Sequence, residues 1–173
     1  DLAENGQRPK AIILTCSDSR APAEILFDQG VGELFVVRVA GNVVAPSLIA
    51  SMEFAATSFG CSLLMVLGHT KCGAVQSALH FCEHPNETPP SKNLSDLVTR
   101  ITPAVKKAKS DSKSTNLMSL ATSYNVESSI DSILNESPIL RSLVEKKDLK
   151  IVGAVLDIHT GRVGVLDQTI KGA

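Results

Sequence analysis

Short apolar runs alternate with longer segments of helical periodicity along this chain. Runs rich in Val, Ile and Leu predict buried strands, which we place at 11–15, 34–39, 62–67 and 151–158. Strands separated by helical segments are typical of an α/β fold with a mostly parallel sheet. A tight turn at Thr160-Gly161-Arg162 then predicts that residues 163–166 pair back antiparallel. We expect about four parallel strands plus an antiparallel edge strand, flanked by helices.

Apolar residues recur at helical spacing between the strands and predict helices at 46–59, 73–82, 94–109 and 118–134, with a short one from Pro138. Pro46 lies in the first turn of its helix and Gly60 follows the last, the places where those residues are favoured. Residues 23–27 are predicted as a short helical or irregular passage. Pro103 predicts a kink or break in its helix.

Polar residues, with several prolines in the first segment, predict loops at 84–92 and 111–115. No repeat or second domain is visible in the pattern, so we expect residues 1–173 to form a single domain. A hydrophobic content of 43% is that of a chain with a packed core and excludes disorder.

Charge and hydropathy narrow the range of partners. The net charge is −1, which gives no reason to expect nucleic acid or an anionic membrane as a partner. The longest apolar runs are interrupted well short of a membrane span. The chain begins at Asp1 with no Met and no signal sequence. A cytoplasmic location is favoured, while a periplasmic or organellar one stays open because the start can reflect processing or truncation.

Two segments that follow predicted strands carry the candidate chemistry. Cys16-Ser-Asp-Ser-Arg20 follows the first strand, and His69-Thr-Lys-Cys72 follows the third. The carboxyl ends of neighbouring parallel strands are where open α/β sheets place their sites. Thiolate, imidazole and carboxylate ligands suit zinc, whereas magnesium or calcium would favour oxygen ligands alone. We therefore predict one zinc ion per chain, bound by Cys16, Asp18, His69 and Cys72.

The carboxylate ligand suggests a switch. Asp18 is the ligand most easily displaced, and Arg20 is placed to capture it. In one state Asp18 binds zinc and the site is closed; in the other Asp18 pairs with Arg20 and water takes the vacant position. The alternative is a permanently closed zinc site that only stabilises the fold.

The other cysteines and the histidines give weaker evidence of a functional role. Cys61 lies in an apolar segment and is predicted to be a buried structural thiol. Cys82, in His80-Phe-Cys-Glu-His84, could belong to a second metal cluster, but we favour a plain helix end. The histidines outside the metal motifs could relay protons, but we expect them to be surface residues: His80, His84 and His159.

Three motifs in order, CxDSR at 16–20, VRVAGN at 37–42 and GHxxCG at 68–73, resemble the β-class carbonic anhydrase family. The likeness runs from Gln7 to about Leu166. It implies reversible hydration of carbon dioxide to bicarbonate and a proton, by attack of zinc-bound hydroxide gated by an Asp18–Arg20 dyad. The resemblance also implies an N-terminal helical arm before this point, and a homodimer or higher oligomer with the active site at the subunit interface.

The resemblance implies a substrate pocket as well. Gln7, Phe35 and Phe54 match pocket residues of the plant-like branch, although Phe54 stands where relatives often have Tyr. Gly73, which opens the helix after Cys72, adds backbone N–H donors near the site. The Gly41-Asn42 turn is expected to approach the metal loop closely.

Some family members carry an inhibitory bicarbonate site made of a Trp, an Arg and a Tyr. Arg38 matches the Arg, but Ile13 and Phe54 replace the other two, so we expect this site to be absent or weak. For Arg38 we expect a structural ion pair instead.

Other functions remain as alternatives. Relatives with the same metal motifs hydrolyse carbon disulfide or carbonyl sulfide on the same scaffold. A non-catalytic zinc or bicarbonate-binding module would need a broken dyad, and both Asp18 and Arg20 are intact. A thiol enzyme using Cys16 would leave His69 and Cys72 unexplained.

Overall fold

A five-stranded sheet forms the centre of the chain. The structure, a computed structural model, describes residues 2–111 and 116–172. The strand order is β2-β1-β3-β4-β5, with β5 alone antiparallel to its neighbour. This confirms the predicted α/β fold with an antiparallel edge strand. The strands are β1 Ala11–Thr15, β2 Leu34–Arg38, β3 Leu63–His69, β4 Lys150–Leu156 and β5 Val163–Lys171.

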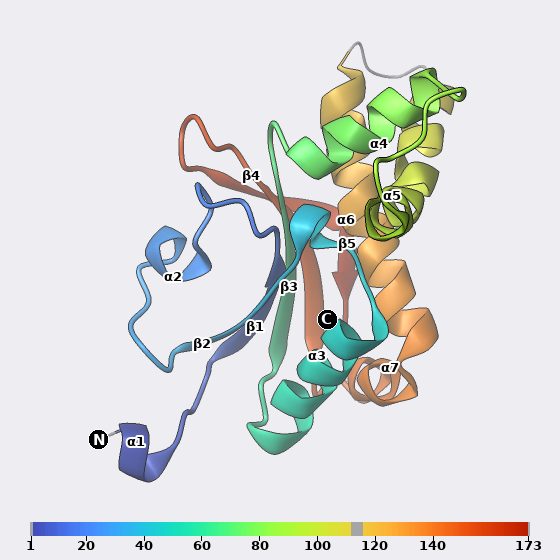
Figure 1. Cartoon of the computed structure of the whole chain (residues 1–173). Coiled ribbons are helices and arrows are strands. Elements are labelled where there is room, and N and C mark those ends of the chain that lie inside the picture. The colour runs from blue at the N-terminus through green and yellow to red at the C-terminus, as the bar shows by residue number, and fades with distance from the viewer. Residues whose placement is uncertain (1, 112–115, 173) are drawn as a thin grey trace.

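The helices are distributed unevenly over the two faces of the sheet. Figure 1 shows α3 to α7 on one side and α2 on the other. No described helix is long and apolar enough to cross a membrane. The helices are α1 Leu2–Asn5, α2 Ala23–Leu26, α3 Pro46–Ser58, α4 Gly73–Glu83, α5 Lys92–Ser110, α6 Leu117–Glu136 and α7 Pro138–Glu145, with a 3-10 turn, η1, at Ala40–Asn42.

Helix α5 differs from its prediction at its first residue and at Pro103. It begins two residues early because Ser91 caps it, accepting a hydrogen bond from the Leu94 N–H at 3.2 Å. Of the kink or break predicted at Pro103, the break is wrong, because the helix continues through this residue to Ser110. Ile101 and Val105, on either side of Pro103, are fully buried, and this packing offsets the hydrogen bond that proline removes. Of the predicted loop 111–115, all but the first residue lies outside the described residues.

The edge strand β5 is longer than predicted. It runs to Lys171 rather than ending at residue 166. A register shift between Ile151 and Gly153 interrupts its pairing with β4. At this irregularity the Gly153 N–H donates to the Thr169 hydroxyl at 2.7 Å. The bulge breaks the simple alternation of apolar and polar residues, which is why the sequence pattern ended too early.

Helix α6 packs unusually close to the sheet. A Cβ atom at Gly68 of β3 would lie 2.8 Å from Val126, and one at Gly153 of β4 would lie 2.7 Å from the same side chain. The fully buried Val126 therefore fits between two strands only because both positions lack a side chain. This contact sets the height of α6 above the carboxyl half of the sheet.

We predict that Gly153→Ala lowers the free energy of unfolding by about 1–3 kcal/mol, because the new methyl group overpacks against Val126 and Thr169. Urea denaturation measures the change. Gly164→Ala is the matched control on β5, since its Cβ would meet only a carbonyl oxygen at 4.0 Å. Equal stability of the two variants would contradict the close packing of α6.

Candidate functional site

The pairing of β1 with β3 brings the two candidate segments together. The strands are parallel, with Thr15 opposite Leu67, so their carboxyl ends share one edge of the sheet. Cys16 follows β1, His69 ends β3, and Cys72 is the N-cap of α4. The ligand atoms of these three residues all lie within 4.8 Å of one another, and all three residues are buried.

The orientation of His69 fits a metal ligand. Its Nδ1 lies 2.9 Å from the Thr70 carbonyl oxygen. Since a carbonyl only accepts, Nδ1 must carry the proton, which leaves Nε2 with a free lone pair. This Nε2 is buried and makes no hydrogen bond of normal geometry among the described residues; its polar neighbours are the Cys16 sulfur and the Asp18 carboxylate. A buried nitrogen without a hydrogen bond is costly, and a cation held jointly with the two thiolates would satisfy it.

The two thiols differ in acidity because they share a hydrogen bond. The Cys72 thiol donates to Cys16, which lowers the pKa of Cys16 well below its usual value and raises that of Cys72. The Gly41 N–H also donates to Cys16 Sγ at 3.2 Å, which favours the thiolate further. Backbone N–H groups of Ala74 and Val75, in the first turn of α4, favour the thiolate of Cys72. Two such sulfurs and an imidazole form a donor set suited to zinc.

The predicted close approach of the Gly41-Asn42 turn is observed, and helix α6 supports it. Gly41 has a φ of 70°, and a Cβ there would meet Ile101 at 2.8 Å. Asn125 donates to the Gly41 carbonyl at 2.7 Å, and the Ser129 hydroxyl donates to the Asn42 carbonyl at 2.9 Å. Sequence reasoning missed Asn125 and Ser129. Their spacing of four residues on the mostly apolar buried face of α6 was the available signal.

Asp18 is bound by Arg20 in this structure. Nε and Nη2 of Arg20 donate to the two carboxylate oxygens at 2.9 and 2.7 Å, and the Arg20 backbone N–H adds a third bond at 3.0 Å. These bonds hold the pKa of Asp18 well below its usual range. The carboxylate Oδ2 lies 3.8 Å from His69 Nε2. Asp18 therefore lies beside the Cys16–His69–Cys72 group, and its role as a fourth ligand stays a prediction.

Arg38 has a different role from the ion pair expected for it. Its Nε donates to the Cys16 carbonyl at 3.1 Å, and its Nη2 donates to the Asp18 carbonyl at 2.7 Å. The guanidinium thus holds the backbone of the loop that carries both residues. Because these acceptors are main-chain atoms, no carboxylate in the sequence pattern could have indicated the contact.

The pocket residues implied by the resemblance are spread over the chain. Gly73 begins α4 beside Cys72. Phe35 and Phe54 have ring centroids 6.5 Å apart and form a cluster with Phe59. Phe35 is paired with Ile12, which lies four residues before Cys16. About 13 Å of β1 therefore separates Phe35 from Cys16.

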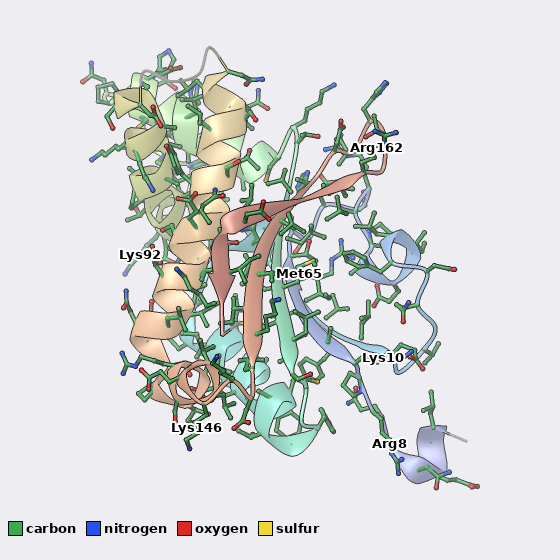
Figure 2. All side chains as sticks on the ribbon, turned by 180° about the vertical axis from the view of Figure 1, so that it is seen from behind. Arg8, Lys10, Met65, Lys92, Lys146 and Arg162 are labelled. Carbon is green, nitrogen blue, oxygen red and sulfur yellow. The ribbon has the colours of Figure 1, made fainter. Side chains whose placement is uncertain are left out.

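Gln7 lies at the opposite end of the sheet from Cys16. It precedes β1, whose five residues alone span about 17 Å. Figure 2 labels the neighbouring Arg8 at one end of the molecule and Arg162, in the β4–β5 turn, at the other. Because β4 is parallel to β1 through β3, the end near Arg162 is the one where Cys16 lies. Gln7 therefore cannot reach the Cys16–His69–Cys72 group of its own chain.

The remaining cysteines behave as predicted. Cys61 is buried, and its thiol donates to the Pro9 carbonyl at 3.2 Å. Cys82 belongs to the last turn of α4, the helix end that we favoured over a metal role. The histidines outside the motifs are exposed, as expected: His80, His84 and His159.

Comparison with known proteins supports one family. The family model described as carbonic anhydrase matches residues 11–163. Carbonic anhydrase 2 of Mycobacterium tuberculosis is 35% identical over 163 residues, which cover 94% of this chain and 77% of that protein. The carbonic anhydrase of Pseudomonas aeruginosa is 30% identical over 167 residues, covering 93% and 74%.

Solved structures agree in fold. The β-carbonic anhydrase CcaA superimposes with a TM-score of 0.81 at 26% identity, covering 94% of this chain and 75% of that one. A Coccomyxa β-carbonic anhydrase in complex with acetazolamide gives a TM-score of 0.81 at 25% identity, covering 94% and 74%. The three motifs, the Cys16–His69–Cys72 group and the sheet that joins them agree with these matches. This chain belongs to the β-carbonic anhydrase family.

Proposed function

We propose that this chain catalyses reversible hydration of carbon dioxide to bicarbonate and a proton, with one zinc ion per chain held by Cys16, His69 and Cys72. The observation that carries the proposal is the two-point pairing of Asp18 with Arg20 beside the buried Nε2 of His69. A closed structural zinc site would use the carboxylate as a ligand and would need no guanidinium to hold it. A bound zinc ion would lower the pKa of a water ligand to about 7 and so supply a nucleophile near neutral pH.

Asp18 would orient that nucleophile. A carboxylate held ionised is an acceptor only, so it can take a hydrogen bond from the attacking oxygen and direct its lone pair toward the carbon. Arg20 binds both carboxylate oxygens and keeps Asp18 negative at neutral pH. The guanidinium also holds the carboxylate off the metal group.

The same pair would provide the switch between an open and a closed site. The Asp18 Oδ2 is 3.8 Å from His69 Nε2, so a modest rotation of the Asp18 side chain would carry it to the metal. Arg20 is more than half exposed, with 55% of its side chain accessible, and water can solvate the guanidinium once Asp18 leaves. The open and closed arrangements therefore compete for one carboxylate.

We propose that the chain forms a homodimer or a higher oligomer with the substrate pocket between subunits. Gln7 lies too far from its own metal group to touch a substrate there, but a neighbouring chain could place it at the site. Phe54 is 53% exposed and continues the aromatic cluster of Phe35 and Phe59. An exposed aromatic residue on such a cluster favours a subunit contact.

Asp18→Asn should reduce carbon dioxide hydration at least about a hundredfold, because the amide neither carries the charge nor accepts as the carboxylate does. Zinc content should stay near that of the wild type, since Cys16, His69 and Cys72 remain. Stopped-flow hydration and atomic absorption on the same sample measure both. Arg20→Ala should also lose activity at neutral pH, because Asp18 is then released to the metal.

The matched control is Asp96→Asn on α5, which removes a carboxylate from a similar Asp–Arg pair with Arg100 at 2.9 Å. It should keep wild-type hydration. Full activity of Arg20→Ala would show that the dyad does not gate the site. Loss of zinc from Asp18→Asn would show that Asp18 is mainly a structural ligand. Turnover of carbon disulfide or carbonyl sulfide in place of carbon dioxide would favour the alternative substrates.

Phe54→Arg should convert the oligomer to a monomer and abolish hydration, because a charge replaces the aromatic contact and the pocket loses its partner. Light scattering after size-exclusion chromatography measures the mass. Leu94→Arg on α5 is the control, since Leu94 is also a large apolar residue, 45% exposed, and lies on a helix that packs against α4 and α6. A Phe54→Arg variant that keeps the wild-type mass and activity would rule out this interface.

A further inference from the structure

Three side chains of the kind that bind metals meet at the far end of α4. His80, His84 and Glu87 place their ligand atoms within 4.8 Å of one another, and all three residues are exposed. The Cys16–His69–Cys72 group lies at the beginning of the same helix. His80 follows Cys72 by eight residues along α4, which is about 12 Å of helix.

Local chain geometry explains why the three side chains meet. His80 and His84 are four residues apart, so they lie on the same face of α4, and their rings stack with centroids 4.4 Å apart. A turn then reverses the chain, closed by a hydrogen bond from the Glu87 N–H to the His84 carbonyl at 2.9 Å. Pro85 occupies the second position of this turn, where its fixed φ is favoured. The turn places the Glu87 carboxylate 2.8 Å from His80 Nε2.

The orientation of the rings suits coordination. His84 Nδ1 lies 2.9 Å from the His80 carbonyl oxygen, so Nδ1 carries the proton and Nε2 is left with its lone pair. His80 Nε2 donates to Glu87 in this arrangement, and a cation could replace that proton between the same two atoms. Metal bonds of about 2.0–2.1 Å place adjacent ligands about 3.3 Å apart. Because the three side chains are exposed, small rotations can bring their ligand atoms from the present spacing of up to 4.8 Å to the spacing that a metal needs.

The donor set and its surroundings select the kind of ion. Two imidazoles and one carboxylate favour a divalent transition metal ion such as Zn²⁺, Ni²⁺ or Cu²⁺ over Mg²⁺ or Ca²⁺. The site is also at the carboxyl end of a helix, where the partial negative charge of the last carbonyls favours a cation. The neighbouring Glu83 is paired with Lys109 at 3.5 Å, so Glu87 is the carboxylate that faces the two imidazoles.

We propose that His80, His84 and Glu87 form a second, surface site for a divalent transition metal ion, separate from the buried cysteine-containing group. Binding there would join the turn at residues 84–87 to the last turn of α4. The site would hold the ion by exposed ligands and so exchange it readily with solvent. It does not depend on the hydration proposed above, because none of its residues belongs to that machinery.

Calorimetric titration of Ni²⁺ into the zinc-loaded chain, without a histidine tag, tests the proposal. The wild type should bind one Ni²⁺ per chain with zinc content unchanged, and its thermal midpoint should rise. His80→Ala and His84→Ala should each weaken the binding at least about tenfold, which corresponds to the loss of 1.4 kcal/mol. His159→Ala, which removes an exposed histidine elsewhere, should bind Ni²⁺ as the wild type does.

Three results would overturn the proposal: a wild type that binds no Ni²⁺ while retaining its zinc, histidine variants that bind Ni²⁺ as tightly as the wild type, or a His159→Ala variant that loses the binding. Glu87→Gln separates a three-ligand site from a two-histidine one. It should bind several-fold more weakly than the wild type, and unchanged affinity would remove Glu87 from the site. Because all three side chains are exposed, the variants should fold, and circular dichroism checks this.

Discussion

The parallel pairing of β1 with β3 is the constraint on which the rest of the site depends. It sets Cys16 and His69 at the same edge of the sheet, and the buried hydroxyl of Thr15 reinforces it by donating to the Leu67 carbonyl at 3.1 Å. A slip of one residue would turn every side chain of β1 to the opposite face and separate the ligands. Helix α6 secures the same edge from above, because the side-chain-free Gly68 and Gly153 allow it to approach closely.

Two arginines hold the loop after β1 through different atoms. Arg38 binds its backbone through the carbonyls of Cys16 and Asp18, while Arg20 binds the Asp18 side chain. The backbone contact uses main-chain carbonyls and would not depend on which way the carboxylate points. This separation would let Asp18 exchange partners without moving Cys16, which is what a switch at a metal centre needs. Asn125 adds rigidity from a helix more than eighty residues away, through the Gly41 turn that donates to Cys16.

Features that depend on local pattern were predictable from the sequence. The four parallel strands were found because each is a short apolar run, and the grouping of Cys16, His69 and Cys72 was found because they lie at or shortly after the ends of such runs. Features that depend on packing were not. The passage of α5 through Pro103 and the bulge that lengthens β5 both follow from contacts with distant elements.

Distant contacts also decide how the site is supported. Asn125 and Ser129 bind main-chain carbonyls of the η1 turn. No residue pattern near that turn indicates these contacts. The position of Gln7 could be predicted only from the direction of β1 relative to the loop after Cys16, and a sequence motif does not give that direction. At the end of α4 the segment 80–84 was noticed for its cysteine, yet the structure brings His80 and His84 together with Glu87 instead.

The most direct test is stopped-flow carbon dioxide hydration by the wild-type chain over roughly pH 6.5–9, a range that brackets a zinc–water pKa near 7, with zinc content determined on the same sample. We expect about one zinc per chain, not counting loosely held surface metal, and fast hydration that rises with pH through this range. Full zinc occupancy with no hydration at any pH would contradict the central claim that Cys16, His69 and Cys72, with the Asp18–Arg20 pair, form a catalytic centre.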